Sequence, residues 1–451
     1  MSALTRRGFV SAPLGAPFVQ ARAQRPNFII ILTDDLGYQD LGCQGAGDLR
    51  TPHLDALAAS GARFTDWYSN APMCAPARAA LMTGRYPLRC GVPTNNPVMP
   101  PSEIMISGLL KPLGYATGVF GKWHLGETDD RHPNSKGFDE FFGFHTCNDH
   151  FSHRNYWFAQ GGLSYHDLWH NRTEVWEEGR YSTELWTEKA LEWLKANRSR
   201  PFFLYLAYSA VHYPMHAPRR YLERCSHIAD FERRIYAAML ACVDDGVGQI
   251  LDFLESSGLR ENTFIVFTSD NGATREPRAG MNRQPARAGS NGPHRGAKFS
   301  LFEGGIRVPA IMSWPARIPP KQVIREMVMS VDVFPTFAAA AGAALPDDRT
   351  IDGRDILPVA AKRASSPHQQ IYWAALGQAA VRRGKWKYIR NPIEADGTPE
   401  GMKPIGGDDS VFLADLSEDP GERKNLRHVM PQLVAELDRA VEQWLAEVKK
   451  P

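Results

Sequence analysis

The 451-residue sequence predicts an α/β fold: a large, doubly wound, mostly parallel sheet sandwiched by helices, followed by a smaller antiparallel sheet with a helix. Several short β-rich runs lack polar–apolar alternation, which is typical of strands buried on both faces of a parallel sheet. Stretches with helical periodicity lie between these runs, as they do in doubly wound folds. Beyond about residue 368, short strand candidates follow one another without intervening helices.

Four apolar runs are expected to form the central strands, at residues 27–33, 115–121, 201–208 and 263–268. Polar residues follow these runs closely, namely Asp34 and Asp35, Lys122 and His124, His212, and Asp270 and Asn271. In open α/β sheets, ligands bind beyond the carboxyl ends of the strands. The runs therefore predict a functional site at one edge of the sheet.

Helices with apolar residues at i, i+3 and i+4 are expected at residues 53–60, 104–112, 183–197 and 230–257. Two long stretches, 144–180 and 273–297, are expected to be irregular, and such loops are usually functional or mobile. The C-terminal strands are expected at residues 370–375, 378–382, 386–390 and 411–415, with a helix at 430–448. We therefore expect an α/β domain over residues 26–367 and a small α+β subdomain over 368–451.

Residues 1–25 differ from the rest of the chain. Arg6 and Arg7 precede a weakly apolar run, and Ala21-Arg22-Ala23 looks like a small-x-small cleavage site. This resembles a twin-arginine export signal, which implies a periplasmic or secreted protein. A disordered basic N-terminus is the alternative.

Composition excludes several classes of function. The net charge of +2 gives no indication of nucleic acid or an anionic membrane as a partner. Six cysteines at irregular spacings, without a C-x-x-C pair, argue against a disulfide framework and a structural zinc site. No apolar stretch beyond the N-terminal segment is long enough to span a bilayer.

The stretch Cys74-Ala75-Pro76-Ala77-Arg78, continuing to Gly84-Arg85, carries the most chemistry. Pro76 suits a first helical turn, and the residues after it are good helix formers. Cys74 is therefore expected at a helix N-terminus, where backbone N–H groups and Arg78 favour a bound anion such as sulfate or phosphate. The alternative is a buried structural cysteine before an ordinary amphipathic helix.

Three carboxylates and one amide form a predicted metal site. Asp34, Asp35, Asp270 and Asn271 offer hard oxygen donors, which suit Ca²⁺ or Mg²⁺ better than zinc. Adjacent strand residues point to opposite faces, so both members of each pair can bind one ion only where the strand gives way to a loop. Taken alone, Asp34-Asp35 could equally be a helix cap or a turn, and Asp270-Asn271-Gly272 is more often a turn signal.

Residues 74–85 and 114–126 resemble the two signatures of the type I formylglycine-dependent sulfatases, arylsulfatase-like members of the alkaline phosphatase superfamily. The resemblance implies that Cys74 is oxidised to formylglycine and contributes to the metal site. It also implies that Arg78 and Lys122 hold the formylglycine hydroxyls while His124 removes a proton. His212 and Lys298 look like the pair that holds the sulfate and protonates the leaving alcohol. His216 and His294 are competitors for these assignments, and Glu303-Gly304-Gly305-Ile306-Arg307-Val308-Pro309 matches a further family pattern expected to be structural.

The resemblance implies a sulfuric ester hydrolase that uses Ca²⁺, with Mg²⁺ as an alternative. Its expected partners are a sulfated carbohydrate and a formylglycine-generating or anaerobic sulfatase-maturing enzyme. The 144–176 segment carries groups suited to sugar hydroxyls, namely Asn148, Asp149, His150, His153, Arg154, Tyr156, Trp157, His170 and Asn171. The alternatives are a phosphonate or phosphate ester hydrolase of the same superfamily and a non-catalytic protein that binds sulfated glycans.

Overall fold

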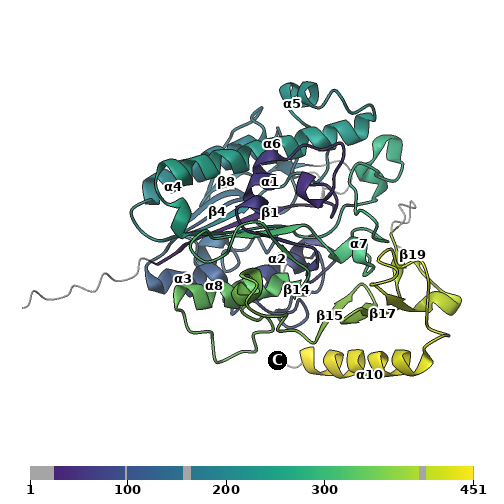
Figure 1. Ribbon diagram of the computed structural model, residues 1–451. Helices are drawn as coiled ribbons and strands as arrows, with labels where there is room; N and C mark the ends of the chain where they lie inside the picture. Colours follow the sequence, from purple (N-terminus) through teal and green to yellow (C-terminus); the bar gives the residue numbers. More distant parts are fainter. Residues whose placement is uncertain (1–24, 97–98, 156–163, 396–402, 450–451) are drawn as a thin grey trace, which may run out of the picture.

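The computed structural model describes residues 25–96, 99–155, 164–395 and 403–449. The predicted twin-arginine segment lies outside the described residues, as do Tyr156 and Trp157. A large sheet lies between two layers of helices, and a smaller C-terminal unit, yellow in Figure 1, packs beside them. This is the α/β architecture that the sequence predicts.

The large sheet has ten strands in the order β13-β2-β12-β11-β1-β10-β4-β5-β8-β9. Their bounds are β1 (Asn27–Thr33), β2 (Ala62–Phe64), β4 (Ala116–Lys122), β5 (Glu140–Phe144), β8 (Trp169–His170), β9 (Thr173–Glu174), β10 (Phe202–Ala207), β11 (Thr263–Ser269), β12 (Ala310–Ser313) and β13 (Gln322–Ile324). The five central strands, β11 to β5, are all parallel to one another. Antiparallel pairs flank them on both sides, where β12 pairs with β11 and β8 pairs with β5. The carboxyl ends of the central strands therefore share one edge.

The apolar strands are buried because both faces of the sheet are covered. Every residue of β1, β4, β10 and β11 is buried. Along β1, Ile29 and Ile31 pack into one apolar cluster, whereas Phe28, Ile30 and Leu32 pack into another on the opposite face. This two-sided burial explains the absence of alternation in the sequence.

One helix layer contains α1 (Pro52–Ala59), α4 (Ser182–Asn197) and α6 (Phe231–Ser256), and the other contains α2 (Cys74–Thr83), α3 (Ile106–Leu110) and α8 (Val333–Ala341) (Figure 1). Shorter helices are α5 (Arg219–Arg224), α7 (Glu303–Ile306) and α9 (Leu357–Ala360). The helix expected at 104–112 is shorter than predicted. It ends at Leu110, and a 3₁₀ turn continues from Lys111 to Leu113 with Pro112 inside it. Proline cannot donate the backbone hydrogen bond that would extend the α-helix.

The C-terminal unit is an antiparallel sheet of β15 (Gln370–Ala375), β16 (Gln378–Arg383), β17 (Trp386–Arg390) and β20 (Val411–Asp415), with α10 (Pro431–Val448). Leu437 and Val441 of α10 pack on Tyr388 of the sheet. Trp373 and Ala380 belong to a cluster that also contains Met73 and Ala77, at the start of α2. The small sheet thus supports the helix that begins at Cys74.

The remaining strands form two-residue pairs: β3 (Trp67–Tyr68) with β14 (Val328–Met329), β6 (Arg154–Asn155) with β7 (Tyr165–His166), and β18 (Ile393–Glu394) with β19 (Lys403–Pro404). The 144–180 stretch, expected to be irregular, therefore contributes β6, β7, β8 and β9. Their brevity explains why no strand pattern marks them. None of the helices in the described part of the chain combines the length and the apolar character that a membrane span requires.

Candidate active site

Cys74 is the first residue of α2 and lies at the carboxyl edge of the large sheet. Met73, the residue before the helix, has an extended backbone, and Asn95 Oδ1 accepts the Ala75 backbone N–H at 3.0 Å. The Cys74 thiol is 1% exposed and donates to Asp34 Oδ1 at 3.4 Å. Burial raises the pKa of the thiol well above its ordinary value, and the Asp34 carboxylate raises it further. An unmodified Cys74 is therefore a neutral thiol and a poor nucleophile.

The predicted acidic residues lie together around Cys74. Asp34 and Asp35 follow β1, and Asp270 follows β11. One ligand atom from each of these carboxylates and from Cys74 lies within 4.8 Å of the others. Asp35 has a φ of 60°, which turns the chain just after the strand. This turn lets both members of the Asp34-Asp35 pair face one point.

Asn271 completes this set with an unused acceptor. Its amide nitrogen donates to Asp35 Oδ1 at 2.7 Å and to the Gly272 carbonyl at 2.9 Å. Its Oδ1 is buried and has no hydrogen-bond partner among the described residues. A buried acceptor without a donor is costly unless a ligand satisfies it. The residues present therefore fit a hard cation held by oxygen atoms of Asp34, Asp35, Asp270 and Asn271.

Three buried cationic side chains balance the three carboxylates. Arg78 contacts Asp270 and Asp34, and its Nη1 also donates to the Lys122 carbonyl at 3.0 Å. Lys122 Nζ lies 2.5 Å from Asp34 Oδ2, and Lys298 Nζ lies 3.0 Å from Asp35 Oδ2. This local balance agrees with the small net charge of the chain.

The three cations are shared unevenly, because Asp34 contacts both Arg78 and Lys122 whereas Asp35 contacts Lys298. Burial opposes ionisation of Asp34, but Lys122, His212 and Arg78 together hold its pKa well below the usual range. Burial raises the pKa of Asp35 to about 7, and Asp34 and Asp270 add to this rise against Lys298. A divalent cation at this point would stabilise the ionised form of Asp35.

His124 follows β4 and reaches the same cluster by a turn of the chain. His124 has a φ of 58°, and its N–H donates to the His145 carbonyl at 2.7 Å, so the chain turns after Lys122 instead of continuing as an extended strand. Both ring nitrogens are buried without a hydrogen-bond partner among the described residues. Burial, Lys122 and Arg78 hold the pKa of His124 well below its usual value. The neutral imidazole is able to accept a proton.

His212 lies on the other side of the carboxylates. Its Nε2 is 3.8 Å from Asp35 Oδ2, and its Nδ1 donates to the Tyr213 carbonyl at 2.6 Å. Burial lowers the pKa of His212 well below its usual value. By contrast, the rings of its competitors face other groups, because His216 packs on His150 and Phe151, and His294 packs on Tyr38.

Two further residues contact the cations of the site and are not among the residues predicted from the sequence. Cys147 follows β5, and its thiol interacts with Lys122; burial raises the thiol pKa, and Lys122 opposes this rise. Glu276 Oε2 lies 3.6 Å from Lys298 Nζ and accepts the Tyr213 hydroxyl at 3.2 Å. The end of the β5 strand could have pointed to Cys147, but no local signal marks Glu276.

The Glu303–Pro309 pattern joins the two parts of the molecule. Glu303 accepts from Tyr68 at 2.6 Å and lies 2.7 Å from Lys387 Nζ on β17. Arg307 pairs with both Glu303 and Asp66. These contacts fit the expected structural role.

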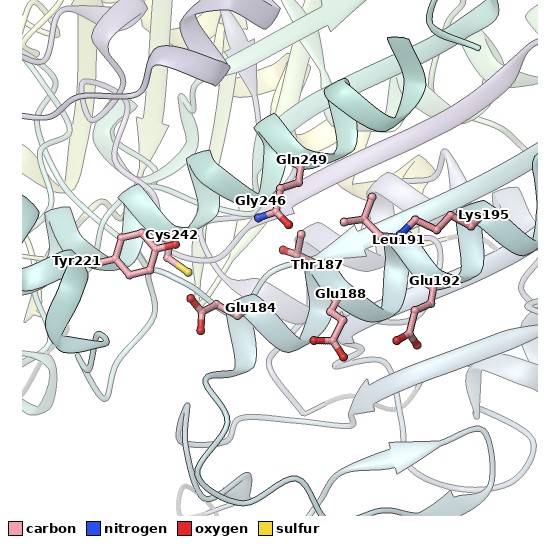
Figure 2. Close-up of a pocket in the computed structure, with 10 residues that line it drawn as sticks. All are labelled: Glu184, Thr187, Glu188, Leu191, Glu192, Lys195, Tyr221, Cys242, Gly246 and Gln249. Atoms are coloured by element: carbon pink, nitrogen blue, oxygen red, sulfur yellow. The ribbon is translucent and has the colours of Figure 1, made fainter. Parts of the chain in front are cut away.

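A cavity of about 430 Å³ lies away from this cluster, between α4, α5 and α6 (Figure 2). Glu184, Glu188 and Glu192 of α4 line it on one side. Each pairs with a neighbouring cation, namely Arg220, Arg180 and Lys189. The carboxylates of this cavity are therefore neutralised within the protein, and the cavity has none of the predicted site residues.

Known proteins resemble this chain over most of its length. The family model Sulfatase matches residues 26–343. N-acetylgalactosamine-6-sulfatase of Mus musculus is 37% identical over 407 residues, covering 85% of this chain and 74% of the relative. Arylsulfatase J of Mus musculus is 32% identical over 470 residues, covering 94% and 76%. The crystal structure of Ps i-CgsB in complex with k-i-k-neocarrahexaose is 34% identical and covers 93% of each chain, with a TM-score of 0.82.

Proposed function

Because the chain belongs to the sulfatase family and is a sulfuric ester hydrolase, we propose that its substrates are sulfate monoesters of carbohydrates. N-acetylgalactosamine-6-sulfatase is named for a sugar sulfate, and Ps i-CgsB was solved with an oligosaccharide. Aryl sulfates would then serve as small model substrates.

The arrangement around Cys74 carries this proposal. The sulfatase family in general implies a metal and a formylglycine, and Cys74 is the residue we propose to be converted. Asp34, Asp35, Asp270 and Asn271 would hold the metal, which we propose to be Ca²⁺, with Mg²⁺ as the alternative. When bound, the cation would supply positive charge where the sulfate ester reacts, and hydrated formylglycine would supply the attacking hydroxyl.

The chain's own residues would perform the proton transfers. His124 is neutral and buried, so it can take a proton from a hydroxyl at residue 74. Lys298 and His212 approach the cluster from the side of Asp35, where they would bind the sulfate oxygens and protonate the leaving alcohol. Arg78 and Lys122 would fix residue 74 and its surroundings electrostatically.

Cleavage of a monoester at a buried site suits this charge arrangement. A sulfate monoester brings one negative charge, and its cleavage moves charge to the leaving oxygen. Preorganised cations are the largest contribution to such catalysis in most enzymes. The carboxylates and cations of the protein nearly cancel one another. The positive charge of the metal and the negative charge of the substrate would then partly offset each other in the site.

Mass spectrometry combined with kinetics tests this proposal. The tryptic peptide 64–78 should carry formylglycine at residue 74 in protein made by a host with a maturation enzyme. The same material should release sulfate from an aryl sulfate much faster than it cleaves a phosphonate monoester or a phosphodiester. Unmodified cysteine in inactive protein from such a host would support the non-catalytic alternative. A preference for phosphodiesters would support the phosphohydrolase alternative. The names of the two relatives described above, both sulfatases, argue against that alternative.

We also propose that a twin-arginine-type signal exports the folded protein to the periplasm or medium. Arg6 and Arg7 support this, and the burial of Cys74 supports maturation by a formylglycine-generating or anaerobic sulfatase-maturing enzyme before export. An Arg6→Lys/Arg7→Lys variant should accumulate in the cytoplasm. Fractionation that finds this variant exported normally would contradict the proposal.

A further inference from the structure

A second cavity, of about 240 Å³, lies on the same edge of the sheet as the cysteine-centred site. His145 lines it directly after β5, and β5 is parallel to β4, with Lys122 opposite Phe144. The His145 carbonyl accepts the His124 N–H, so the cavity and the candidate base share a backbone hydrogen bond. From β1 to β5 the sheet crosses three strand spacings of about 4.8 Å, so His145 lies about 14 Å from the end of β1.

Two histidines of this cavity are fixed in the same way. His145 Nδ1 donates to Asp167 Oδ1 at 2.9 Å, and His166 Nδ1 donates to Glu174 Oε1 at 2.8 Å. A carboxylate on Nδ1 selects the tautomer whose Nε2 carries a lone pair. The Nε2 atoms of both rings are buried and have no hydrogen-bond partner among the described residues.

Aromatic rings form the rest of the wall. Trp169 Nε1 donates to the same Asp167 oxygen at 2.8 Å, and the Trp169 ring meets the His145 ring edge-on at 5.6 Å. Tyr165, 47% exposed, also lines the cavity. Aromatic faces with a few oriented acceptors are well suited to a sugar ring, which offers C–H faces and hydroxyl donors.

The charge of the cavity disfavours an anionic ligand. Glu127, Asp129 and Asp167 line it with a single guanidinium, that of Arg172, which pairs with Asp129. A sulfate ester would therefore meet an excess of carboxylates, whereas a neutral sugar would not. The volume is also below the range of about 300–1,000 Å³ typical of drug-sized ligands, so it suits one ring.

We propose that this cavity binds an unsulfated sugar residue of an oligosaccharide whose sulfated residue occupies the site at Cys74. The inference rests on the proposed function and extends it, because it makes a glycan chain, rather than a monosaccharide sulfate, the preferred substrate. This cavity also takes the place of some residues that the sequence predicts to bind sugar, because the polar groups of those residues bond within the protein. Both ring nitrogens of His150 are hydrogen-bonded within the protein, one to the Ser182 hydroxyl and the other to the His212 carbonyl. Asn148 likewise donates to the His153 and Asp167 carbonyls.

The test compares two substrates in shape-matched variants. His145→Phe and His166→Phe keep an aromatic ring but remove the Nε2 acceptor. The probes are 4-nitrophenyl sulfate, which is too short to reach the cavity, and the better hydrolysed of two sulfated hexasaccharides whose unsulfated residues are neutral, from carboxyl-reduced chondroitin 6-sulfate and from κ-carrageenan. We expect each variant to lower the ratio of hexasaccharide to aryl sulfate kcat/KM about tenfold, the effect of losing one hydrogen bond. His428→Phe, at an exposed histidine of the C-terminal unit whose ring pairs with Asp408, is the matched control and should keep the wild-type ratio.

The outcomes separate the two proposals. If aryl sulfate and hexasaccharide lose activity equally in both variants, the cavity is not a sugar subsite, although the carbohydrate sulfatase proposal stands. If the wild type hydrolyses only the aryl sulfate, the carbohydrate proposal fails, and this inference fails with it. Glu127→Gln adds a third readout: it should increase turnover of hexasaccharides that are sulfated on every residue, relative to those sulfated at one end. No change in that ratio would contradict the assignment of charge selection to this cavity.

Discussion

Arg78 donates two hydrogen bonds to a single carboxylate oxygen of Asp270, from Nε at 3.1 Å and from Nη2 at 2.9 Å. The same Nη2 lies 3.2 Å from Asp34 Oδ2. One guanidinium from the helix of Cys74 therefore fixes the residues that follow β1 and β11. The candidate metal ligands and the candidate nucleophile are held by one planar group.

Arg78→Lys should lower kcat/KM for aryl sulfates at least about 100-fold, because an ammonium cannot span Asp34 and Asp270 and leaves buried carboxylates poorly paired. Steady-state kinetics at saturating Ca²⁺ would measure this. Arg219→Lys, at an exposed arginine, is the matched control and should behave as wild type. Activity within threefold of wild type in Arg78→Lys would contradict the role assigned to the guanidinium.

Cys74→Ala should abolish turnover while the fold remains, because the side chain is small and its loss removes only a thiol. Circular dichroism and sulfate release would be measured on the same preparation. Cys90→Ala, at another buried cysteine away from the carboxylates, should retain activity. Near-wild-type activity in Cys74→Ala would show that the nucleophile lies elsewhere.

Chelation should lower activity and melting temperature together, because the ion binds only the folded site. Removing a ligand present at 100 times its Kd costs about 2.7 kcal/mol, which corresponds to roughly 3 °C for a chain of this length. Calorimetry before and after EDTA, with Ca²⁺ or Mg²⁺ added back at equal concentration, would measure the effect and compare the two ions. An unchanged melting curve would argue against an integral metal.

Asp244 should make part of the stability depend on pH. It accepts the N–H groups of His53 and Leu54 at the start of α1, yet burial raises its pKa from 3.8 to about 6. Between about pH 4 and 6 the folded protein keeps this proton while the unfolded chain releases it. The free energy of unfolding should therefore fall by about 3 kcal/mol as the pH rises through this window.

Asp244→Asn should lose this contribution. Urea unfolding of both proteins at pH 4 and pH 7 would measure it, and other groups cancel because they titrate in both. A variant whose stability changes with pH as steeply as that of the wild type would refute the assignment.

Lys387→Met should destabilise the junction between the large sheet and the C-terminal sheet. Lys387 is fully buried and lies 2.7 Å from Glu303 and 3.4 Å from Glu422. Its loss leaves Glu422 without a counter-charge and Glu303 with only the Arg307 ion pair, which costs about 3–5 kcal/mol. Adding Glu422→Gln should recover part of the loss in chemical unfolding, and no recovery would mean that the destabilisation comes from lost packing instead.

The sequence predicts four of the five parallel central strands of the large sheet, because their signals are local. The unbroken apolar run before Asp34 and the run before Asp270 each mark a buried strand, and parallel strands must end at one edge. The α2 helix is equally local, since Pro76 and the residues after it favour a helix that begins near Cys74. These signals bring the acidic residues and the cysteine together without any knowledge of long-range contacts.

Backbone turns and distant partners could not be predicted in this way. The left-handed φ values of Asp35 and His124 depend on the packing of the loops around them, and neither is a glycine whose identity would signal a turn. Glu276 approaches Lys298 only because the 273–297 loop folds back, and no periodicity encodes that path. The ring tautomers of the histidines that line the cavity at β5 likewise depend on their carboxylate partners, and only the fold shows which carboxylates those are.

The contact between Trp373 and Ser69 can form only late in the synthesis of the chain. Trp373 Nε1 donates to the Ser69 carbonyl at 2.8 Å, and the two residues are 304 positions apart. Ser69 Oγ in turn donates to the Asp270 carbonyl at 2.5 Å. At about 5–20 residues per second, the ribosome needs roughly 15–60 s to make the chain between these contacts. During that interval the segment bearing Cys74 is already outside or leaving the ribosome but lacks its C-terminal support. The maturation enzyme proposed above would have most access to the thiol during this interval, and slower synthesis of the last third of the chain should then raise the modified fraction.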